Sequence, residues 1–293
     1  PLKSPPTPTA LPALTAPTLH VLLVITKGEI GGAQAHVIEL CRALRGRVRF
    51  TAVIGGGRGT FLEHALQGLG VATHPLPQLR NALNPLRVLA SVQALRVHMR
   101  TRLQGDPPDL IHVHSAVAGV VARLAGKLSQ TPVVYTVHGF GFKPQAPLLV
   151  RTNAWLAEAL LAAWTTRMVC VSDHEKALAA TLPMDPARAS VIPNAIADVP
   201  WRSDPRAPEP SLAMVARMAP PKRHDLLLQA LALLAAEGLR PATALMGDGP
   251  LRDEHQRLAG ALELAQVQFM GDVHNVPEQL ARHAIFVLLS DHE

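Results

Sequence analysis

Between residues 19 and 192 the hydrophobic residues form short continuous runs, and the segments between these runs have the spacing of amphipathic helices. Continuous runs are typical of strands buried on both faces of a parallel sheet. Strands are predicted over 19–26, 48–54, 71–75, 109–114, 132–137, 167–171 and 189–192. Helices are predicted over 35–44, 61–69, 85–103 (capped by Asn84), 116–128, 148–164 and 173–181. This alternation predicts an α/β domain with a doubly wound parallel sheet over residues 19–192.

The same alternation resumes in a second, shorter domain. Strands are predicted over 212–216, 241–246, 266–270 and 284–289, and helices over 222–236, 250–262 and 277–282. Residues 193–210 hold five prolines without periodicity and are predicted to form a linker. Residues 1–18 are rich in Pro and Thr and are predicted to form a disordered tail. Because few strands and no closing helix precede the last residue, we expect the second domain, 211–293, to be incomplete.

Composition and charge narrow the class of protein. Hydrophobic residues make up 48% and charged residues 17% of the chain, as in an ordinary globular protein. No apolar run approaches the roughly 18 residues of a membrane-spanning helix. Cys41 and Cys170 lie far apart in apolar segments, which favours buried thiols in a reducing compartment, so a cytoplasmic location is expected.

The charge is distributed unevenly along the chain. Residues 1–200 hold 19 Lys and Arg against 10 Asp and Glu, a charge of +9, whereas residues 201–293 hold 9 against 12, a charge of −3. A basic first part attracts nucleic acid, anionic lipid or a phosphorylated substrate. Nucleic acid is disfavoured, because the few aromatic residues are not interleaved with the basic ones as a stacking platform.

A basic turn separates the predicted strand 212–216 from the helix 222–236. Arg217 ends the strand, two prolines follow, and Lys222 opens a helix that is predicted to bury Leu226, Leu227, Leu231 and Leu234. A guanidinium, an ammonium and a helix N-terminus would then face one volume, which favours a compact polyanion such as a diphosphate. A solvated basic turn is the alternative interpretation.

Two glycine-rich turns also follow predicted strands. Gly31 and Gly32 come after the first strand, and Gly247, Asp248 and Gly249 come after the strand 241–246. Since ligands of open α/β sheets bind beyond the carboxyl ends of strands, either turn can admit a ligand phosphate, and an ordinary tight turn is the alternative. The first turn does not fit G-x-G-x-x-G, so a dinucleotide site is disfavoured.

Three histidines lie where predicted strands end. His112 and His114 end the fourth strand, where we expect them to point to opposite faces, and His138 ends the fifth. A metal would need convergent ligands with carboxylate or thiolate help, and neither is evident, so we expect no metal. We expect His138 to donate or accept hydrogen bonds in an interdomain cleft, and His112 and His114 to be structural.

These motifs, taken in order, resemble those of family 4 glycosyltransferases from residue 19 to 293. In the second domain the resemblance rests on VARMAPPK (215–222), MGDGPLR (246–252), FMGDV (269–273) and LSDHE (289–293). In the first domain it rests on GGAQ (31–34), TVHG (136–139), VS (171–172) and IPNAI (192–196). The resemblance implies the GT-B architecture, in which two Rossmann-like domains face one cleft.

The resemblance also implies roles for single residues in a transferase that retains anomeric configuration and needs no metal. Arg217 and Lys222 would hold the donor diphosphate, His138 would contact the transferred sugar, and Glu293 would lie near the sugar hydroxyls. Further donor contacts would come from Gly31, Gly32, Gly247, Asp248, Gly249 and Val276. The chain ends before the second Glu of the E-x7-E motif, so we expect it by itself to be nearly inactive.

The donor and acceptor are predicted in broader terms. A UDP-sugar is the default donor, and a glycan or lipid-linked acceptor of bacterial surface polysaccharide assembly is expected at the inner membrane face. The apolar helix 148–164 would border that acceptor or an anionic membrane, and core packing is the alternative for this helix. A GT-B-like nucleotide-sugar epimerase and a non-catalytic nucleotide-sugar-binding fragment are the rival functions.

Overall fold

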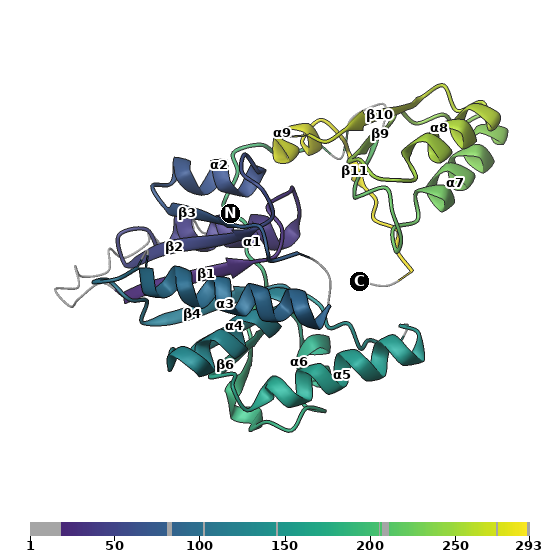
Figure 1. Cartoon of the computed structure of the whole chain (residues 1–293). Coiled ribbons are helices and arrows are strands. Elements are labelled where there is room, and N and C mark those ends of the chain that lie inside the picture. Colours follow the sequence, from purple (N-terminus) through teal and green to yellow (C-terminus); the bar gives the residue numbers. More distant parts are fainter. Residues whose placement is uncertain are drawn as a thin grey trace, which may run out of the picture. The chain divides into compact units, whose positions relative to one another are not determined.

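The computed structural model describes residues 19–80, 84–101, 103–144, 146–204, 206, 211–273 and 275–291 (Figure 1). The predicted tail, 1–18, lies outside the described residues. Contacts within the chain divide it into two compact units, unit 1 (Pro1–Ala197) and unit 2 (Asp198–Glu293). The boundary between them falls inside the proline-rich segment 193–210.

Unit 1 is built on a seven-stranded parallel sheet with the strand order β3-β2-β1-β4-β5-β6-β7. The strands are β1 (Leu19–Ile25), β2 (Val48–Gly55), β3 (Ala72–Leu76), β4 (Leu110–His114), β5 (Val133–Val137), β6 (Arg167–Cys170) and β7 (Ala189–Val191). Each confirms a predicted strand. The strand order reverses direction between β1 and β4, and the carboxyl ends of strands at such a switch point are the usual place for a ligand in open α/β sheets.

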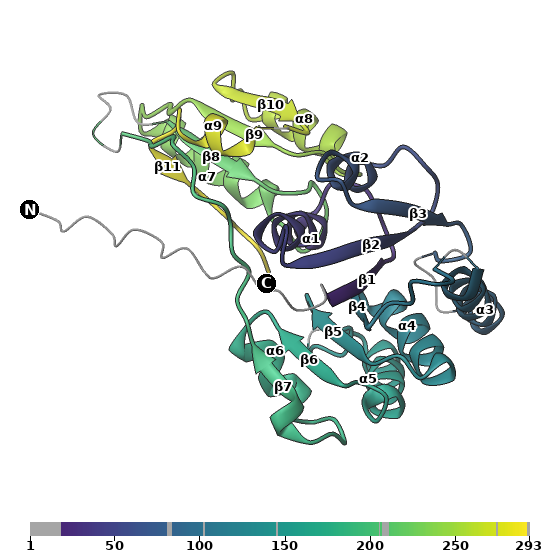
Figure 2. The same cartoon turned by 90° about the vertical axis from the view of Figure 1, so that its left-hand side faces the viewer.

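Helices cover both faces of this sheet, with α1 and α2 on one side and α3, α4 and α5 on the other (Figure 2). They are α1 (Gly32–Ala43), α2 (Phe61–Gly68), α3 (Pro85–Thr101), α4 (Ala116–Ser129), α5 (Leu148–Ala162), α6 (Asp173–Ala179) and the 3₁₀ turn Pro186–Arg188. The side-chain oxygen of Asn84 accepts hydrogen bonds from two amides of the first turn of α3, as predicted. None of the described helices combines the length and apolar character that crossing a bilayer requires.

The central strands are apolar throughout because both of their faces are buried. In β1, Val21 and Leu23 pack beneath α1 and α2, while Leu22 and Val24 pack on the opposite side. The thiols of Cys41 and Cys170 are buried and free, and burial raises their pKa values to about 12 and about 11. The prediction of buried cysteines is therefore confirmed.

The core between α4 and α5 contains a buried ion pair. Nη1 of Arg123 donates to Oε2 of Glu158 at 2.8 Å, and its Nε donates to the carbonyl of Gly119 at 2.9 Å. The guanidinium lies over the ring of Tyr135, 4.6 Å from its centroid. Arg123 is fully buried and Glu158 is 6% exposed, so neither charge has water to replace its partner.

Unit 2 has a four-stranded parallel sheet with the order β10-β9-β8-β11. Its elements are β8 (Leu212–Val215), α7 (His224–Ala236), β9 (Thr243–Met246), α8 (Arg252–Ala261), β10 (Val267–Gly271), α9 (Val276–Leu280) and β11 (Ile285–Phe286). The last strand is much shorter than the predicted 284–289. The helix α7 begins at His224 instead of Lys222, because the backbone of Lys222 pairs with Ser290 in an isolated antiparallel bridge.

The buried face of α7 differs from the predicted one. Leu227, Leu228 and Leu231 are buried, whereas Leu226 is 40% exposed, so the predicted burial of Leu226 was wrong. The buried face also contains His224, whose ring stacks on that of His255 with the centroids 5.3 Å apart. Burial and the nearby His255 lower the pKa of His224 to about 4.

This pKa predicts that unit 2 loses stability in mild acid. Unfolded His224 takes up a proton below pH 6.5, whereas the folded ring stays neutral down to about pH 4. The free energy of unfolding should therefore fall by about 1.4 kcal/mol per pH unit between these values for this one group. Urea denaturation at several pH values, followed by the methyl resonances of Leu228, measures the slope. His224→Leu should flatten it by that amount, and an unchanged slope would contradict the assignment.

Candidate functional site

The loops that follow β8, β9 and β10 are joined by backbone hydrogen bonds at the carboxyl edge of the unit 2 sheet. The amide of Met218 donates to the carbonyl of Asp248 at 2.9 Å, and the amide of Leu251 donates to the carbonyl of Met218 at 3.0 Å. The amide of Gly247 donates to the carbonyl of Gly271 at 2.7 Å. The basic turn and the Gly-Asp-Gly turn, predicted separately, therefore form one continuous surface.

Close backbone contact explains both glycines of the Gly-Asp-Gly turn. Gly247 has φ +125°, and a Cβ there would lie 2.2 Å from the carbonyl oxygen of Ala216. A Cβ on Gly249 would lie 2.4 Å from the carbonyl oxygen of Met218. Packing between the loops thus requires these glycines, and their role in donor binding stays a prediction.

We expect Gly247→Ala to destabilise unit 2 by about 1–3 kcal/mol, because the new Cβ meets backbone atoms and the φ angle is one that L residues rarely adopt. Gly260→Ala is the matched control, since a Cβ on Gly260, inside α8, meets nothing within 4 Å. The control should stabilise by about 0.5–1 kcal/mol, the usual gain of alanine over glycine within a helix. Urea denaturation compares the two variants, and equal effects would contradict the packing argument.

Arg217 is the predicted phosphate-binding residue whose charge has no partner in the described part of the chain. It is exposed on the loop that joins β8 to α7, and no acidic side chain described in unit 2 pairs with it. Lys222 lies on the same loop and is half-buried. The structure therefore brings both predicted cations to the loop between β8 and α7.

Two other arginines of this edge are neutralised. Arg223 pairs with Asp225 at 2.7 Å and with Asp291 at 2.8 Å, and these hydrogen bonds raise its pKa. Nη1 of Arg252 lies 2.8 Å from Oδ2 of Asp248. The amide of Gly249 also donates to the Asp248 carboxylate, and these two contacts lower the pKa of that carboxyl. The Asp248 carboxylate is thus held within its own loop.

The remaining predicted residues of unit 2 are less informative. Val276 is the half-buried first residue of α9 and follows β10. Glu293 lies outside the described residues, so its predicted place near the sugar hydroxyls stays a prediction.

In unit 1 the predicted residues gather at the carboxyl edge of the sheet, near the switch point. Gly31 is the N-cap of α1 and Gly32 its first residue, so α1 begins three residues earlier than predicted. A Cβ on Gly31 would lie 2.6 Å from Oε1 of Gln34, the end of a flexible side chain, and a Cβ on Gly32 would meet nothing within 4 Å. Packing within the chain therefore does not require glycine at position 32.

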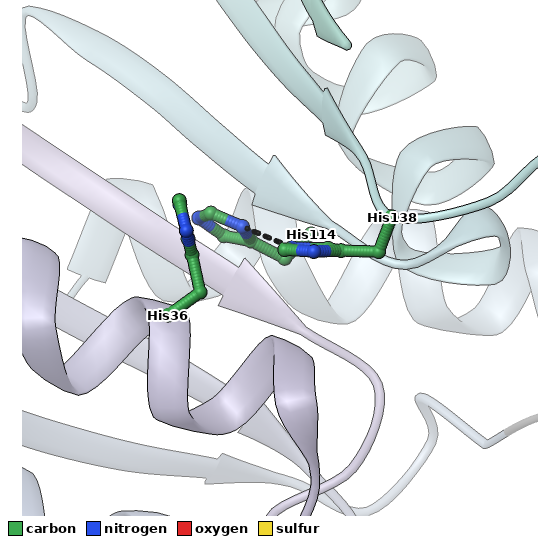
Figure 3. A group of neighbouring side chains, drawn as sticks. All are labelled: His36, His114 and His138. Atoms are coloured by element: carbon green, nitrogen blue, oxygen red, sulfur yellow. Dashed lines mark hydrogen bonds between the residues drawn. The ribbon is translucent and has the colours of Figure 1, made fainter. Parts of the chain in front are cut away.

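Four of the described histidines lie at this edge, and three of them converge (Figure 3). Nδ1 of His114 lies 3.2 Å from Nε2 of His138, which follows β5. His36, on α1, was not among the predicted residues; its ring centroid is 5.1 Å from that of His138 and 5.5 Å from that of His114. With a helix predicted to start at residue 35, His36 was expected to be its second residue. Because α1 starts at Gly32, His36 lies one turn inside the helix.

The prediction that His112 and His114 point to opposite faces was wrong. Their ring centroids are 4.4 Å apart, because residues two apart in a strand project from the same face. Nε2 of His112 lies 2.7 Å from Oγ1 of Thr136 on the neighbouring strand β5. The ring of His112 thus packs against that of His114, one of the convergent three.

Burial keeps these rings neutral. Burial is the main reason that the pKa values of His112 and His138 fall to about 4 and that the pKa of His114 falls well below 6.5. Repulsion from the neighbouring histidines lowers these pKa values further. Burial also lowers the pKa of His36, although a hydrogen bond with Asn194 raises it in part. Neutral imidazole has one donor and one acceptor nitrogen, which suits hydrogen bonding to hydroxyl groups.

The loop that carries His138 is held by the buried carboxylate of Glu175, which was not among the predicted site residues. Oε2 of Glu175 accepts from the amide of Phe140 at 2.9 Å, and its Oε1 lies 3.2 Å from Nζ of Lys143. The Ser172-x-x-Glu175 spacing is that of a helix-capping pair, and Oγ of Ser172 does accept from the amide of Glu175. That pattern predicts the start of α6, but not the contact with Phe140.

Comparisons with known proteins identify both units. Residues 30–198 match Glycosyltransferase Family 4, and residues 209–293 match Glycosyl transferases group 1. Over 97 residues the chain is 37% identical to the Escherichia coli UDP-Gal:alpha-D-GlcNAc-diphosphoundecaprenol alpha-1,3-galactosyltransferase, a match that covers 32% of this chain and 25% of that protein. Over 302 residues it is 27% identical to the Streptomyces fradiae 2-deoxystreptamine N-acetyl-D-glucosaminyltransferase, a match that covers 90% of this chain and 70% of that protein. The chain thus spans about a quarter of the length of the first relative and 70% of the second.

The fold agrees with these matches. Anabaena HepE in complex with UDP and glucose superposes with a TM-score of 0.72 at 18% identity, covering 93% of this chain and 74% of that one. A likeness at this identity shows a shared fold, and the two parallel sheets are those of the predicted GT-B architecture. The chain belongs to Glycosyltransferase Family 4.

Proposed function

We propose that this protein transfers a sugar, with retention of configuration, from a UDP-sugar to a lipid-linked glycan in bacterial surface polysaccharide assembly. The observation that carries the proposal is the exposed Arg217, unpaired among the described residues, beside the Gly247 turn at the carboxyl edge of the unit 2 sheet. Two names support the donor and acceptor classes: the E. coli relative is named for a UDP-galactose donor and a diphosphoundecaprenol acceptor, and HepE was solved with UDP.

Unit 2 would stabilise the leaving group. As the bond between the anomeric carbon and the diphosphate oxygen breaks, negative charge grows on the diphosphate. Arg217 would bind it through a bidentate fork and Lys222 as a point charge, so both contacts strengthen in the transition state. The acceptor oxygen forms the new bond to the anomeric carbon, and its proton leaves with the diphosphate. Because these cations supply the positive charge, we propose transfer without a metal cofactor.

Unit 1 would hold the sugar. The open space over Gly32 and the N-terminus of α1, next to Gly31, would admit the donor phosphate. A neutral His138 would hydrogen-bond a hydroxyl of the transferred sugar, and the contact of Glu175 with Phe140 would hold its loop in place. Glu293 would complete the sugar contacts.

The acceptor side of unit 1 has an apolar surface on α5. Four exposed leucines lie on this helix: Leu148, Leu149, Leu156 and Leu160 are between 52% and 78% exposed. Beside them is a cavity of about 400 Å³ lined by Phe142, Pro144, Arg151, Thr152, Trp155, Leu156, Leu178 and Thr181. This surface, on the basic part of the chain, would bind the lipid of the acceptor and the anionic cytoplasmic face of the plasma membrane.

We expect the double variant Leu149→Glu/Leu160→Glu to bind vesicles that contain phosphatidylglycerol at least about ten-fold less, because each leucine loses apolar contact with the bilayer. Leu233→Glu/Leu239→Glu, at two leucines of unit 2 that are 72% and 57% exposed, is the matched control. Co-sedimentation with vesicles measures the bound fraction. An equal loss in the control would show that added charge, and not the α5 surface, weakens binding.

Calorimetric titration of UDP, GDP and ADP tests the donor assignment. We expect UDP to bind the chain and Arg217→Ala/Lys222→Ala to lose that binding. Binding of GDP or ADP but not UDP would agree with a transferase whose donor carries that nucleotide instead of UDP. If none of the three binds, the proposed donor site is wrong. A nucleotide bound without any sugar transfer to a lipid-linked acceptor would favour a binding module.

A further inference from the structure

Three imidazole rings from different elements of unit 1 converge at one point (Figure 3). His36 comes from α1, His114 from the end of β4, and His138 from the loop after β5. One nitrogen from each lies within 4.8 Å of those of the other two. We propose that this three-histidine cluster binds one divalent transition-metal ion, such as Zn²⁺, and that the bound ion inhibits the protein.

The spacing of two rings already suits a tetrahedral ion. Two nitrogens bound to Zn²⁺ at 2.0–2.1 Å are about 3.3 Å apart. Nδ1 of His114 and Nε2 of His138 are 3.2 Å apart and share a hydrogen bond, which the ion would replace. The third ligand, His36, is half-buried on α1, and its nitrogen lies within 4.8 Å of those of His114 and His138, so binding of an ion would require its side chain to move closer. The convergence that the sequence did not reveal is therefore present.

His114 is the central ligand of the cluster. Its side chain is fully buried. Its Nδ1, the nitrogen that faces His138, would bind the ion, and its Nε2 would then carry the ring proton. Figure 3 shows the ring of His114 between those of His36 and His138, so this side chain faces both of its proposed co-ligands. Burial also keeps the three rings neutral at pH 7, the form that binds metals.

The surroundings of the cluster favour Zn²⁺, Co²⁺ or Ni²⁺ over Mg²⁺ or Ca²⁺. Imidazole nitrogens suit the first group, whereas the second requires oxygen ligands, and no described carboxylate belongs to the cluster. Outer contacts orient the rings: His112 packs on His114, and Asn194 hydrogen-bonds His36. Three protein ligands leave a fourth position for water or an anion.

Inhibition follows from the position of His138, and this part rests on the proposed function. His138 is the residue that we propose to contact the transferred sugar. A metal ion that occupies its nitrogen removes that hydrogen bond and places a positive ion where the sugar would lie. The ion is thus an inhibitor and not a cofactor of the proposed transfer.

Titration of the whole chain with Co²⁺, followed by its visible absorption, tests the binding site directly. We expect one Co²⁺ per chain with the intense bands of tetrahedral coordination, and displacement by Zn²⁺. His36→Gln removes one of the three ligands from a half-buried position. It should weaken Co²⁺ binding by at least about 100-fold, because even the loss of an outer contact to a ligand commonly costs 10- to 100-fold in metal affinity. His64→Gln, at an exposed histidine of α2, is the matched control and should bind as the wild type does.

The outcomes separate this proposal from the proposed function. Absence of a tetrahedral band, or equal weakening in His36→Gln and His64→Gln, would overturn the metal site, while UDP binding in a chelating buffer stays unaffected. If Co²⁺ binds as expected, saturating Zn²⁺ should slow transfer at least about ten-fold in an otherwise wild-type enzyme with the complete E-x7-E motif. It should leave the rate of the same enzyme with His36→Gln nearly constant, since that variant binds the ion poorly. Metal binding without inhibition would remove the inhibitory role alone.

Discussion

Replacing Arg217 and Lys222 together by alanine should lower kcat/KM for sugar transfer by at least about 10³-fold in an enzyme with the complete E-x7-E motif, since loss of one group that stabilises transition-state charge commonly costs 10²–10³. The loop between β8 and α7 carries both side chains, and the neighbouring Arg223 and Arg252 are already paired with carboxylates. No paired arginine can replace the lost charge without breaking its own ion pair. The transfer rate and the Kd of the nucleotide are measured together.

Two comparisons make this prediction specific. Arg217→Lys keeps the charge but loses the bidentate fork, so it should recover only part of the rate. Arg257→Ala removes an exposed arginine of α8 that donates to the carbonyl of Asp253 within its own helix, and should leave the rate unchanged. If Arg257→Ala slows transfer as much as Arg217→Ala does, net charge and not the loop explains the effect.

Replacing Glu158 by leucine should destabilise unit 1 by about 3–5 kcal/mol, because it leaves the Arg123 guanidinium buried without its counter-ion. Arg123 is fully buried between α4, α5 and β5, so water cannot reach the charge. Urea denaturation measures the loss. The effect is large because a single substitution removes one charge and leaves the other.

The double variant Arg123→Met/Glu158→Leu tests this explanation. Apolar residues of similar volume often replace a buried ion pair at little cost, so the double variant should be more stable than Glu158→Leu alone. Glu39→Leu, which breaks the exposed pair with Arg42, should change stability by less than about 1 kcal/mol. A double variant less stable than Glu158→Leu would show that Arg123 stabilises unit 1 by contacts other than the ion pair.

The strands were predictable because burial on both faces leaves a strong signal in the sequence. Each strand of unit 1 was predicted within one residue at either end, and the alternation with helices led to the fold class. The short strand β11 and the starts of α1 and α7 were predicted less well. The helix α1 starts at a glycine, and the start of α7 is delayed by the bridge between Lys222 and Ser290. Hydrophobic periodicity carries no signal for either effect.

The candidate site was predictable loop by loop but not as an assembly. The sequence placed Arg217, the Gly247 turn and His138 beyond the ends of strands, where the structure has them. The convergence of His36 with His114 and His138 joins residues about 80 to 100 positions apart, and the contact of Glu175 with Phe140 spans 35. The two-residue period of a strand predicts that His112 and His114 share one face, and the prediction of opposite faces did not apply this rule.

The backbone hydrogen bonds between Met218, Asp248 and Leu251 have a consequence for the thermodynamics of binding. A flexible loop loses conformational entropy when a ligand orders it, and this loss reduces affinity. Here two loops restrain each other in the absence of any ligand, and the glycines at 247 and 249 allow them to touch. The surface is therefore preorganised, and most of the ordering cost is met when unit 2 folds.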